Sequence, residues 1–255
     1  MFWSKPQLTV SPEEQQWIEA SFAWFLTQFG QDYFLKRRTI LPTATFFPDK
    51  YHGTEACVLQ VVRRTCQYMD VPPDSVEVGF FEEGTERLSD RTLHPQGEYR
   101  SGAAGLYLHD QEAVAKARIA IHAGQLKRPM ALVATIAHEL GHVILLGGGR
   151  ISRENKSHEP LTDLLTVFMG LGIFNANAAF QFNQWQDHSH QGWQVSRQGY
   201  MSEEMFGYAL AGYCWLRNER PPGWTDLLAM NVRHYFKRSL AYLEKGGQTN
   251  FPALR

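Results

Sequence analysis

Two histidines and a glutamate at helical spacing are the residues of this chain best suited to do chemistry. His138, Glu139 and His142 form the pattern His-Glu-x-x-His. Residues four apart lie one above the other on a helix, so His138 and His142 can both reach a single tetrahedral Zn²⁺ ion. Glu139 then lies beside the metal, where its carboxylate can take a proton from a water molecule. The spacing therefore predicts a metal-dependent hydrolytic site.

The spacing requires that these residues lie on a helix, and the surrounding sequence predicts one. The stretch Pro129–Ala137 is apolar and begins with proline, a residue favoured at the first helical position. We expect this buried helix to run to about Leu146 and to end at the glycines 147–149, which tolerate a positive φ. Gly141 inside it costs about 1 kcal/mol relative to alanine, which indicates that another group approaches the helix closely there.

The third metal ligand has to come from farther along the chain, because a catalytic zinc ion takes three protein ligands. Glu159 and Asp163 are again four residues apart, at the start of an apolar helix, so they share a face. In that arrangement Glu159 can bind the metal, while Asp163 accepts a hydrogen bond from a ligating histidine and fixes its orientation. His158 is a rival ligand, but its side chain points about a quarter-turn away from that of Glu159.

Taken together, these residues resemble the gluzincins, the thermolysin-like branch of the zincin metallopeptidases. In that family a His-Glu-x-x-His helix is completed by a glutamate within Glu-x-x-x-Asp on a following helix. The resemblance covers roughly residues 118–175. It implies the following roles: zinc ligands His138, His142 and Glu159, general base Glu139, and Asp163 as the residue that orients His138.

The sequence also departs from that family. The Asn-Glu pair that usually opens the third-ligand helix is replaced by His158-Glu159, and the spacing from the second histidine is a little short of the thermolysin pattern. The Gly-x-Met-Glu-Asn motif of the gluzincin aminopeptidases is missing. Leu145 and Gly148 stand where the metzincin branch needs glycine and a third ligand, which excludes that branch.

Simpler interpretations of these residues stay open. His138 and His142 could be buried core histidines with satisfied hydrogen bonds. Glu159 and Asp163 could be ordinary acids in a first helical turn, where carboxylates favour the positive end of the helix dipole.

A zincin mechanism also needs a hydrogen-bond donor for the oxyanion of the tetrahedral intermediate. The downstream candidates are Tyr200, Tyr208, His188 and His190. Tyr200 is favoured because it follows Gly199 and precedes a helix start. The alternative is that Tyr200 only packs against its neighbours or caps a helix.

The remaining elements predict an α+β, zincin-like fold. We expect a small mixed sheet, followed by the metal-binding helix, the ligand helix and a helical C-terminal part. Expected strands are 75–81, 105–109 and 118–122, and expected helices, beginning with the capping box at Ser11, are 11–30, 54–69, 202–216 and 225–245. The segment 174–200 is expected to be irregular. Residues 1–255 form one catalytic domain, with a possible division into 1–146 and 147–255.

The strand Arg118–His122, just upstream of the metal-binding helix, is expected to form the sheet edge. An extended peptide could add there as an extra strand. The alternative, about as well supported by the sequence, is an ordinary core strand.

Composition narrows the class of protein. A net charge of −1 gives no electrostatic case for nucleic acid. The three cysteines, at no metal-binding spacing, suit free thiols in a reducing compartment. Residues 1–10 lack the apolar run of a signal peptide, and the apolar stretch 164–174 is about half the length needed to span a bilayer. We therefore expect a cytoplasmic protein with no transmembrane segment.

The function predicted by the sequence is that of a zinc-dependent endopeptidase acting on peptide or protein substrates. The main alternative is a zincin-fold regulatory or binding module with little or no turnover. A third possibility is a metallohydrolase that cleaves a non-peptide amide. Substrate identity is not encoded in the ligand pattern, because specificity depends on the shape of the site.

Overall fold

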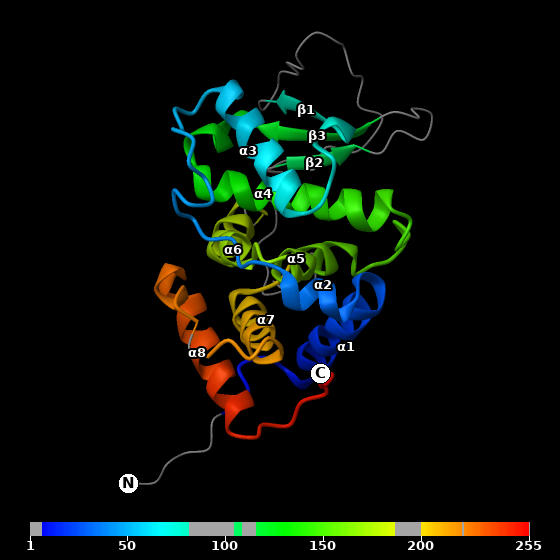
Figure 1. Cartoon of the computed structure of the whole chain (residues 1–255), viewed down its shortest axis with the longest axis vertical. Coiled ribbons are helices and arrows are strands. Elements are labelled where there is room, and N and C mark those ends of the chain that lie inside the picture. The colour runs from blue at the N-terminus through cyan, green and yellow to red at the C-terminus, as the bar shows by residue number, and fades with distance from the viewer. Residues whose placement is uncertain (1–6, 82–104, 109–115, 187–199, 221, 255) are drawn as a thin grey trace.

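The computed structural model describes residues 7–81, 105–108, 116–186, 200–220 and 222–254. Within these residues the chain forms eight α-helices and one three-stranded sheet. The three strands follow one another in the middle of the chain, and both ends of the chain are helical (Figure 1). The expected α+β class is confirmed at this level.

The sheet is mixed, and its last strand in the chain lies in its centre. The strands are β1 (Val76–Phe81), β2 (Gly105–Leu108) and β3 (Ala117–His122). β3 is parallel to β1 on one side and antiparallel to β2 on the other. The expectation that Arg118–His122 forms the sheet edge is therefore wrong. Both edges of β3 are already hydrogen-bonded, and its apolar centre, residues 119–121, is buried, which suits a central strand.

The N-terminal helices are α1 (Pro12–Phe29), α2 (Gln31–Lys36) and α3 (Glu55–Tyr68). α1 and α3 begin at the capping residues that the sequence indicates, whereas α2, which was not expected, follows Gly30 without a side-chain cap. Ser11 forms the expected capping box with Glu14, and the Thr54 side chain accepts a hydrogen bond from the backbone of Cys57. Side-chain oxygens satisfy amide groups that have no partner inside the helix, so these starts are set locally.

The helix expected to bind a metal is α4 (Pro129–His142), and a π-helical turn, Val143–Gly147, continues it. The ligand helix is α5 (His158–Phe168), followed by α6 (Gly172–Gln186). The segment from residue 174 was expected to be irregular, but its first part belongs to α6. The helix is stabilised because its alanines and Phe174 are buried against α4 and α5. Residues 187–199 of that segment lie outside the described part of the chain.

The C-terminal part contains α7 (Glu203–Leu216) and α8 (Met230–Glu244). The last helix begins five residues later than expected from Thr225, which instead starts a short 3-10 turn, Thr225–Leu227. The side chain of Asn177 explains the break, since it donates to the carbonyl of Leu227 and accepts from the amide of Ala229. These bonds fix an extended link between the turn and α8.

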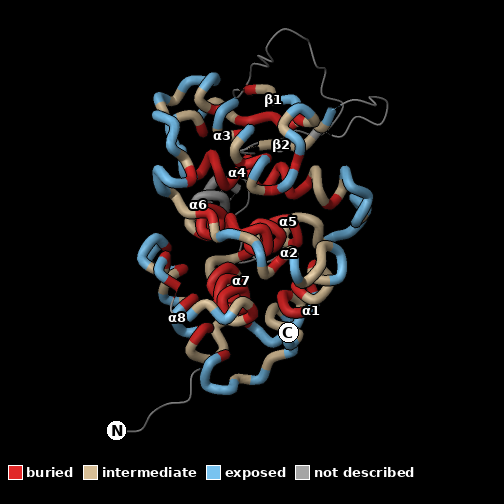
Figure 2. The backbone as a smooth tube through the Cα atoms, viewed as in Figure 1, coloured by how far each residue is buried: buried red, intermediate tan, exposed pale blue. Residues whose placement is uncertain are grey.

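The helix α4 lies in the middle of the molecule. Figure 1 shows α4 between the sheet on one side and α5 and α6 on the other, with α1, α7 and α8 at the far end of the long axis. α4, α5 and α7 are buried along most of their length (Figure 2). Pro129–Gly147 is the one described helix long and apolar enough to cross a membrane, but 72% of it is buried inside the protein, as in a core helix.

Phe168, at the end of α5, is fixed by a group of aromatic side chains. Its ring centroid lies 4.9 Å from that of Phe34 and 5.2 Å from that of Phe25. These contacts connect α5 to α1 and α2 on the side away from the sheet. The other end of α5 is thereby held against α4, where the candidate ligands lie.

Candidate metal centre

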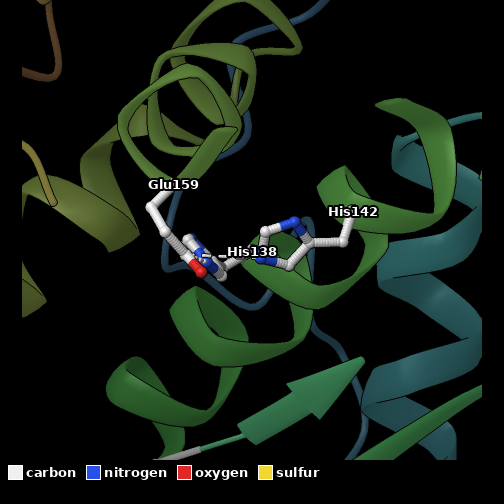
Figure 3. A group of neighbouring side chains, drawn as sticks. All are labelled: His138, His142 and Glu159. Carbon is white, nitrogen blue, oxygen red and sulfur yellow. Dashed lines mark hydrogen bonds and ion pairs between the residues drawn. The ribbon is translucent and has the colours of Figure 1, made fainter. Parts of the chain in front are cut away.

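The three predicted ligands converge between α4 and α5. The Nε2 atom of His138 lies 3.0 Å from Oε2 of Glu159, and the Nε2 atom of His142 lies 3.4 Å from the same oxygen. One ligand atom from each residue lies within 4.8 Å of the others. Figure 3 shows the two imidazoles, one helical turn apart on α4, with the carboxylate reaching them from α5.

The two nitrogen-to-carboxylate distances and the donor types fit a bound divalent metal. Ligands about 2.0–2.1 Å from a tetrahedral zinc ion lie about 3.3 Å from one another. The two nitrogen-to-carboxylate distances are 3.0 and 3.4 Å. Two imidazoles and one carboxylate are also a donor set found in catalytic zinc sites. The described residues can therefore hold a metal, although the geometry alone does not identify the metal as zinc.

The electrostatics of the cluster favour a positive charge beside Glu159. Burial acts to lower the pKa of His138, but hydrogen bonds with Asp163 and Glu159 raise it well above its ordinary value. Burial acts to raise the pKa of Glu159, yet hydrogen bonds with His138 and His142 keep that pKa far below its ordinary value. A proton on His138 thus takes the place that a metal cation can occupy between the same two groups.

Asp163 lies behind His138, as expected. Its Oδ1 accepts a hydrogen bond from Nδ1 of His138 at 2.8 Å, and its Oδ2 accepts one from the backbone amide of Met201 at 3.0 Å. An ionised carboxylate can only accept, so Nδ1 of His138 carries a proton. The ring is thereby oriented with Nε2 toward Glu159, the orientation that a metal ligand needs.

Glu139 is buried next to the ligands but lies outside the group of three. Its carboxyl group faces β2, where a Cβ added to Gly105 would lie 3.0 Å from Oε1 of Glu139. Burial raises the pKa of Glu139 to about 7, the charge of His138 opposes this rise, and the backbone of Tyr107 donates a hydrogen bond to the carboxylate. A carboxyl group with this pKa can take up and release a proton near neutral pH.

Of the expected oxyanion donors, one lies at the cluster. The ring of Tyr200 is 5.3 Å from that of His138. Tyr208 is buried elsewhere, in α7, where its hydroxyl group contacts Glu19 and Gln15, so it is not a candidate. His188 and His190 lie outside the described residues.

His158, the rival ligand, lies beside the cluster on the side of the other carboxylate oxygen. Its Nδ1 is 3.6 Å from Oε1 of Glu159, whereas the histidines of α4 face Oε2. Its ring centroid is 5.8 Å from that of His142. Among the described residues, the group of possible metal ligands contains Glu159 and not His158, which lies next to it.

The sequence analysis missed two residues that contact His142. The ring of Tyr107, on β2, stacks on His142 with centroids 6.2 Å apart, and the guanidinium group of Arg153 lies 6.0 Å from the Tyr107 ring. Oγ1 of Thr162, on α5, lies 3.2 Å from Nδ1 of His142. Thr162 directly precedes Asp163 in the sequence. A hydroxyl residue at this position, next to the residue expected to orient His138, is the signal that could have predicted a partner for His142. Nothing in the local sequence signals the contact of Tyr107.

No protein-family model matches this chain, and neither curated proteins nor solved structures gave a match.

Proposed function

We propose that this protein is a zinc-dependent endopeptidase with a zincin-like arrangement of the gluzincin type. The observation on which this rests is the convergence of His138, His142 and Glu159, with Asp163 hydrogen-bonded to the far side of His138. The order along the chain supports it: sheet, His-Glu-x-x-His helix, then Glu-x-x-x-Asp helix. Zinc is proposed as the metal because its catalytic sites commonly use two histidines and a glutamate.

In this proposal Glu139 is the general base. Zinc, when bound, polarises the scissile carbonyl and lowers the pKa of the attacking water. The buried carboxylate of Glu139, with its pKa of about 7, takes a proton from that water and delivers it to the leaving amine. Tyr200, whose ring lies beside His138, is the proposed donor to the oxyanion. Asp163 keeps His138 in one orientation throughout.

The proposed substrate is a peptide segment in extended conformation. Since β3 is paired on both sides, the expected peptide site on Arg118–His122 is replaced by β2, an edge among the described strands. β2 is close to the centre, because Tyr107 stacks on His142 and Gly105 contacts Glu139. An extended peptide can pair with the backbone of such an edge.

The free cysteines support a reducing compartment. Cys57, Cys66 and Cys214 are all unpaired thiols, and burial raises the pKa of Cys66 to about 12, which makes it inert. We propose a cytoplasmic location on this basis.

The test measures zinc content and cleavage on the same preparations. The wild type should bind about one zinc ion per chain and cleave an unfolded protein such as casein, with loss of cleavage in chelator and recovery on adding zinc. His138→Ala should lose both zinc and cleavage. Glu139→Gln should keep zinc but lose cleavage by roughly 10²- to 10⁴-fold.

Each other outcome has a clear meaning. A wild type that binds no stoichiometric zinc would overturn the proposed metal centre. Zinc binding without any cleavage would support the regulatory module instead. Full cleavage by zinc-loaded Glu139→Gln would remove Glu139 from the role of base.

A further inference from the structure

We infer that Thr162 is a positioning residue for His142, and that Gly141 is glycine because the side chain of Thr162 occupies the space beside it. The inference rests on the proposed metal centre, since it concerns how the second histidine ligand is oriented. His138 is oriented by an anionic carboxylate. The structure gives His142 a different partner, the neutral hydroxyl group of Thr162, which directly precedes Asp163 on α5.

The hydrogen bonds of Thr162 define the direction of its proton. Oγ1 of Thr162 donates to the backbone carbonyl of His158, one turn earlier in α5, at 2.7 Å. A hydroxyl group has one proton to donate and two lone pairs. With its proton directed to that carbonyl, Oγ1 accepts from Nδ1–H of His142 at 3.2 Å. Nδ1 is then the nitrogen of His142 that keeps its proton in the metal-bound form, which leaves Nε2, the atom that faces Glu159, available to bind a metal.

The methyl group of Thr162 explains a glycine inside the His-Glu-x-x-His helix. A Cβ added to Gly141 would lie 2.6 Å from Cγ2 of Thr162, while the next atoms of Thr162 would be 3.5 and 3.8 Å away. Only the methyl group prevents a side chain at position 141. The close approach that Gly141 indicates in the sequence is therefore that of Thr162, a residue with no exposed surface.

One helix thus contributes three kinds of contact to the centre. Glu159 supplies the ligand, Asp163 orients His138, and Thr162 orients His142. The contact between Gly141 and Thr162 sets how closely α4 and α5 approach. The two orienting bonds also differ in strength, because a hydrogen bond to a carboxylate is stronger than one to a hydroxyl group.

The hydroxyl group is tested with variants that separate it from the methyl group. Thr162→Val keeps the shape and removes the acceptor, so zinc should bind about 10- to 100-fold more weakly, the loss typical when the partner of a ligating histidine is removed. Thr162→Ser keeps the acceptor and should bind zinc within about threefold of the wild type. Thr166→Val is the matched control. It removes a buried hydroxyl group that donates to the carbonyl of Asp163 at 2.7 Å, and it should leave zinc affinity unchanged.

The packing is tested without metal, by urea unfolding of the metal-free protein. Gly141→Ala should lower the unfolding midpoint when Thr162 is present, because the new Cβ meets the methyl group. In combination with Thr162→Ser the same change should leave the midpoint unchanged or raise it, since alanine favours a helix. The double variant should also recover the zinc affinity that Gly141→Ala alone loses.

The outcomes separate this inference from the proposed function. If the wild type binds no zinc, the proposed centre fails. If the wild type binds zinc and Thr162→Val binds it equally well, the positioning role of Thr162 is overturned while the centre stands. If Gly141→Ala lowers the urea midpoint by the same amount in both backgrounds, the packing explanation of Gly141 is overturned.

Discussion

At the scale of single residues, the hydrogen bonds of the candidate centre fix which atoms of the buried polar groups donate and which accept. Asp163 can only accept hydrogen bonds, and it has two donors, the His138 ring and the Met201 amide. His138 is left with Nε2 directed at Glu159. Because all of these groups are buried or nearly so, an unsatisfied donor or acceptor there costs about 1–3 kcal/mol. The ligand geometry is therefore fixed by the partners of the ligands.

The prediction at this scale concerns Asp163→Asn. The His138 ring and the Met201 amide donate to different oxygens of Asp163. In asparagine one of these positions carries a donating NH₂ group, which faces one of the two donors. We expect zinc affinity to fall by roughly 10- to 100-fold, measured by competition with a chelator of known affinity. Glu159→Ala should abolish tight binding. His158→Ala is the control and should retain it, whereas the reverse pattern would make His158 the third ligand.

At the scale of elements, the sheet and α4 meet at the proposed base. Gly105 on β2 packs against Thr135 and Glu139, residues one turn apart on α4. Tyr107, two residues along the same strand, covers His142. β2 therefore lies against both Glu139 and His142, while the side chains that orient the two histidines come from α5. The function of the proposed base thus depends on β2, and the orientation of the proposed ligands depends on α5.

Gly105→Ala should separate these functions. The added Cβ would lie 2.5 Å from the Thr135 methyl group and 3.0 Å from Oε1 of Glu139, so β2 must shift, at a cost of roughly 1–3 kcal/mol of unfolding free energy. Zinc affinity should stay near wild type, while the kcat for casein cleavage should fall. Gly223→Ala, where an added Cβ meets no atom within 4 Å, is the control. Unchanged kcat in Gly105→Ala would contradict the role of β2.

At the scale of the whole molecule, the proposed metal ligands lie on two different helices in the middle of the fold. α4 packs on the sheet and on α6, and α5 is connected through Phe168 to the N-terminal helices. A metal bound between α4 and α5 thus joins elements that belong to both ends of the molecule. Ligand binding to the folded state alone stabilises that state in proportion to the logarithm of free metal concentration.

Zinc should therefore raise the thermal stability of the entire chain. At free zinc about 1,000 times the dissociation constant, the gain is about 4 kcal/mol, which corresponds to roughly 10 °C in Tm for a chain of this size. The measurement is a calorimetric scan with buffered zinc and with chelator. His138→Ala should show the same Tm in both conditions. If the Tm of the wild type is the same with zinc and with chelator, the proposed binding of zinc between the two helices is contradicted.

The sequence by itself determined those features that depend on spacing along one segment. His138 with His142, and Glu159 with Asp163, share faces because residues four apart on a helix do so, and the caps at Ser11 and Thr54 act within three residues. Tertiary structure decided the rest. The central place of β3, the helix α6 and the start of α8 depend on strand pairing and on contacts between distant segments. The contacts of Thr162 and Tyr107 with His142 likewise come from separate elements, and no local spacing encodes how those elements pack.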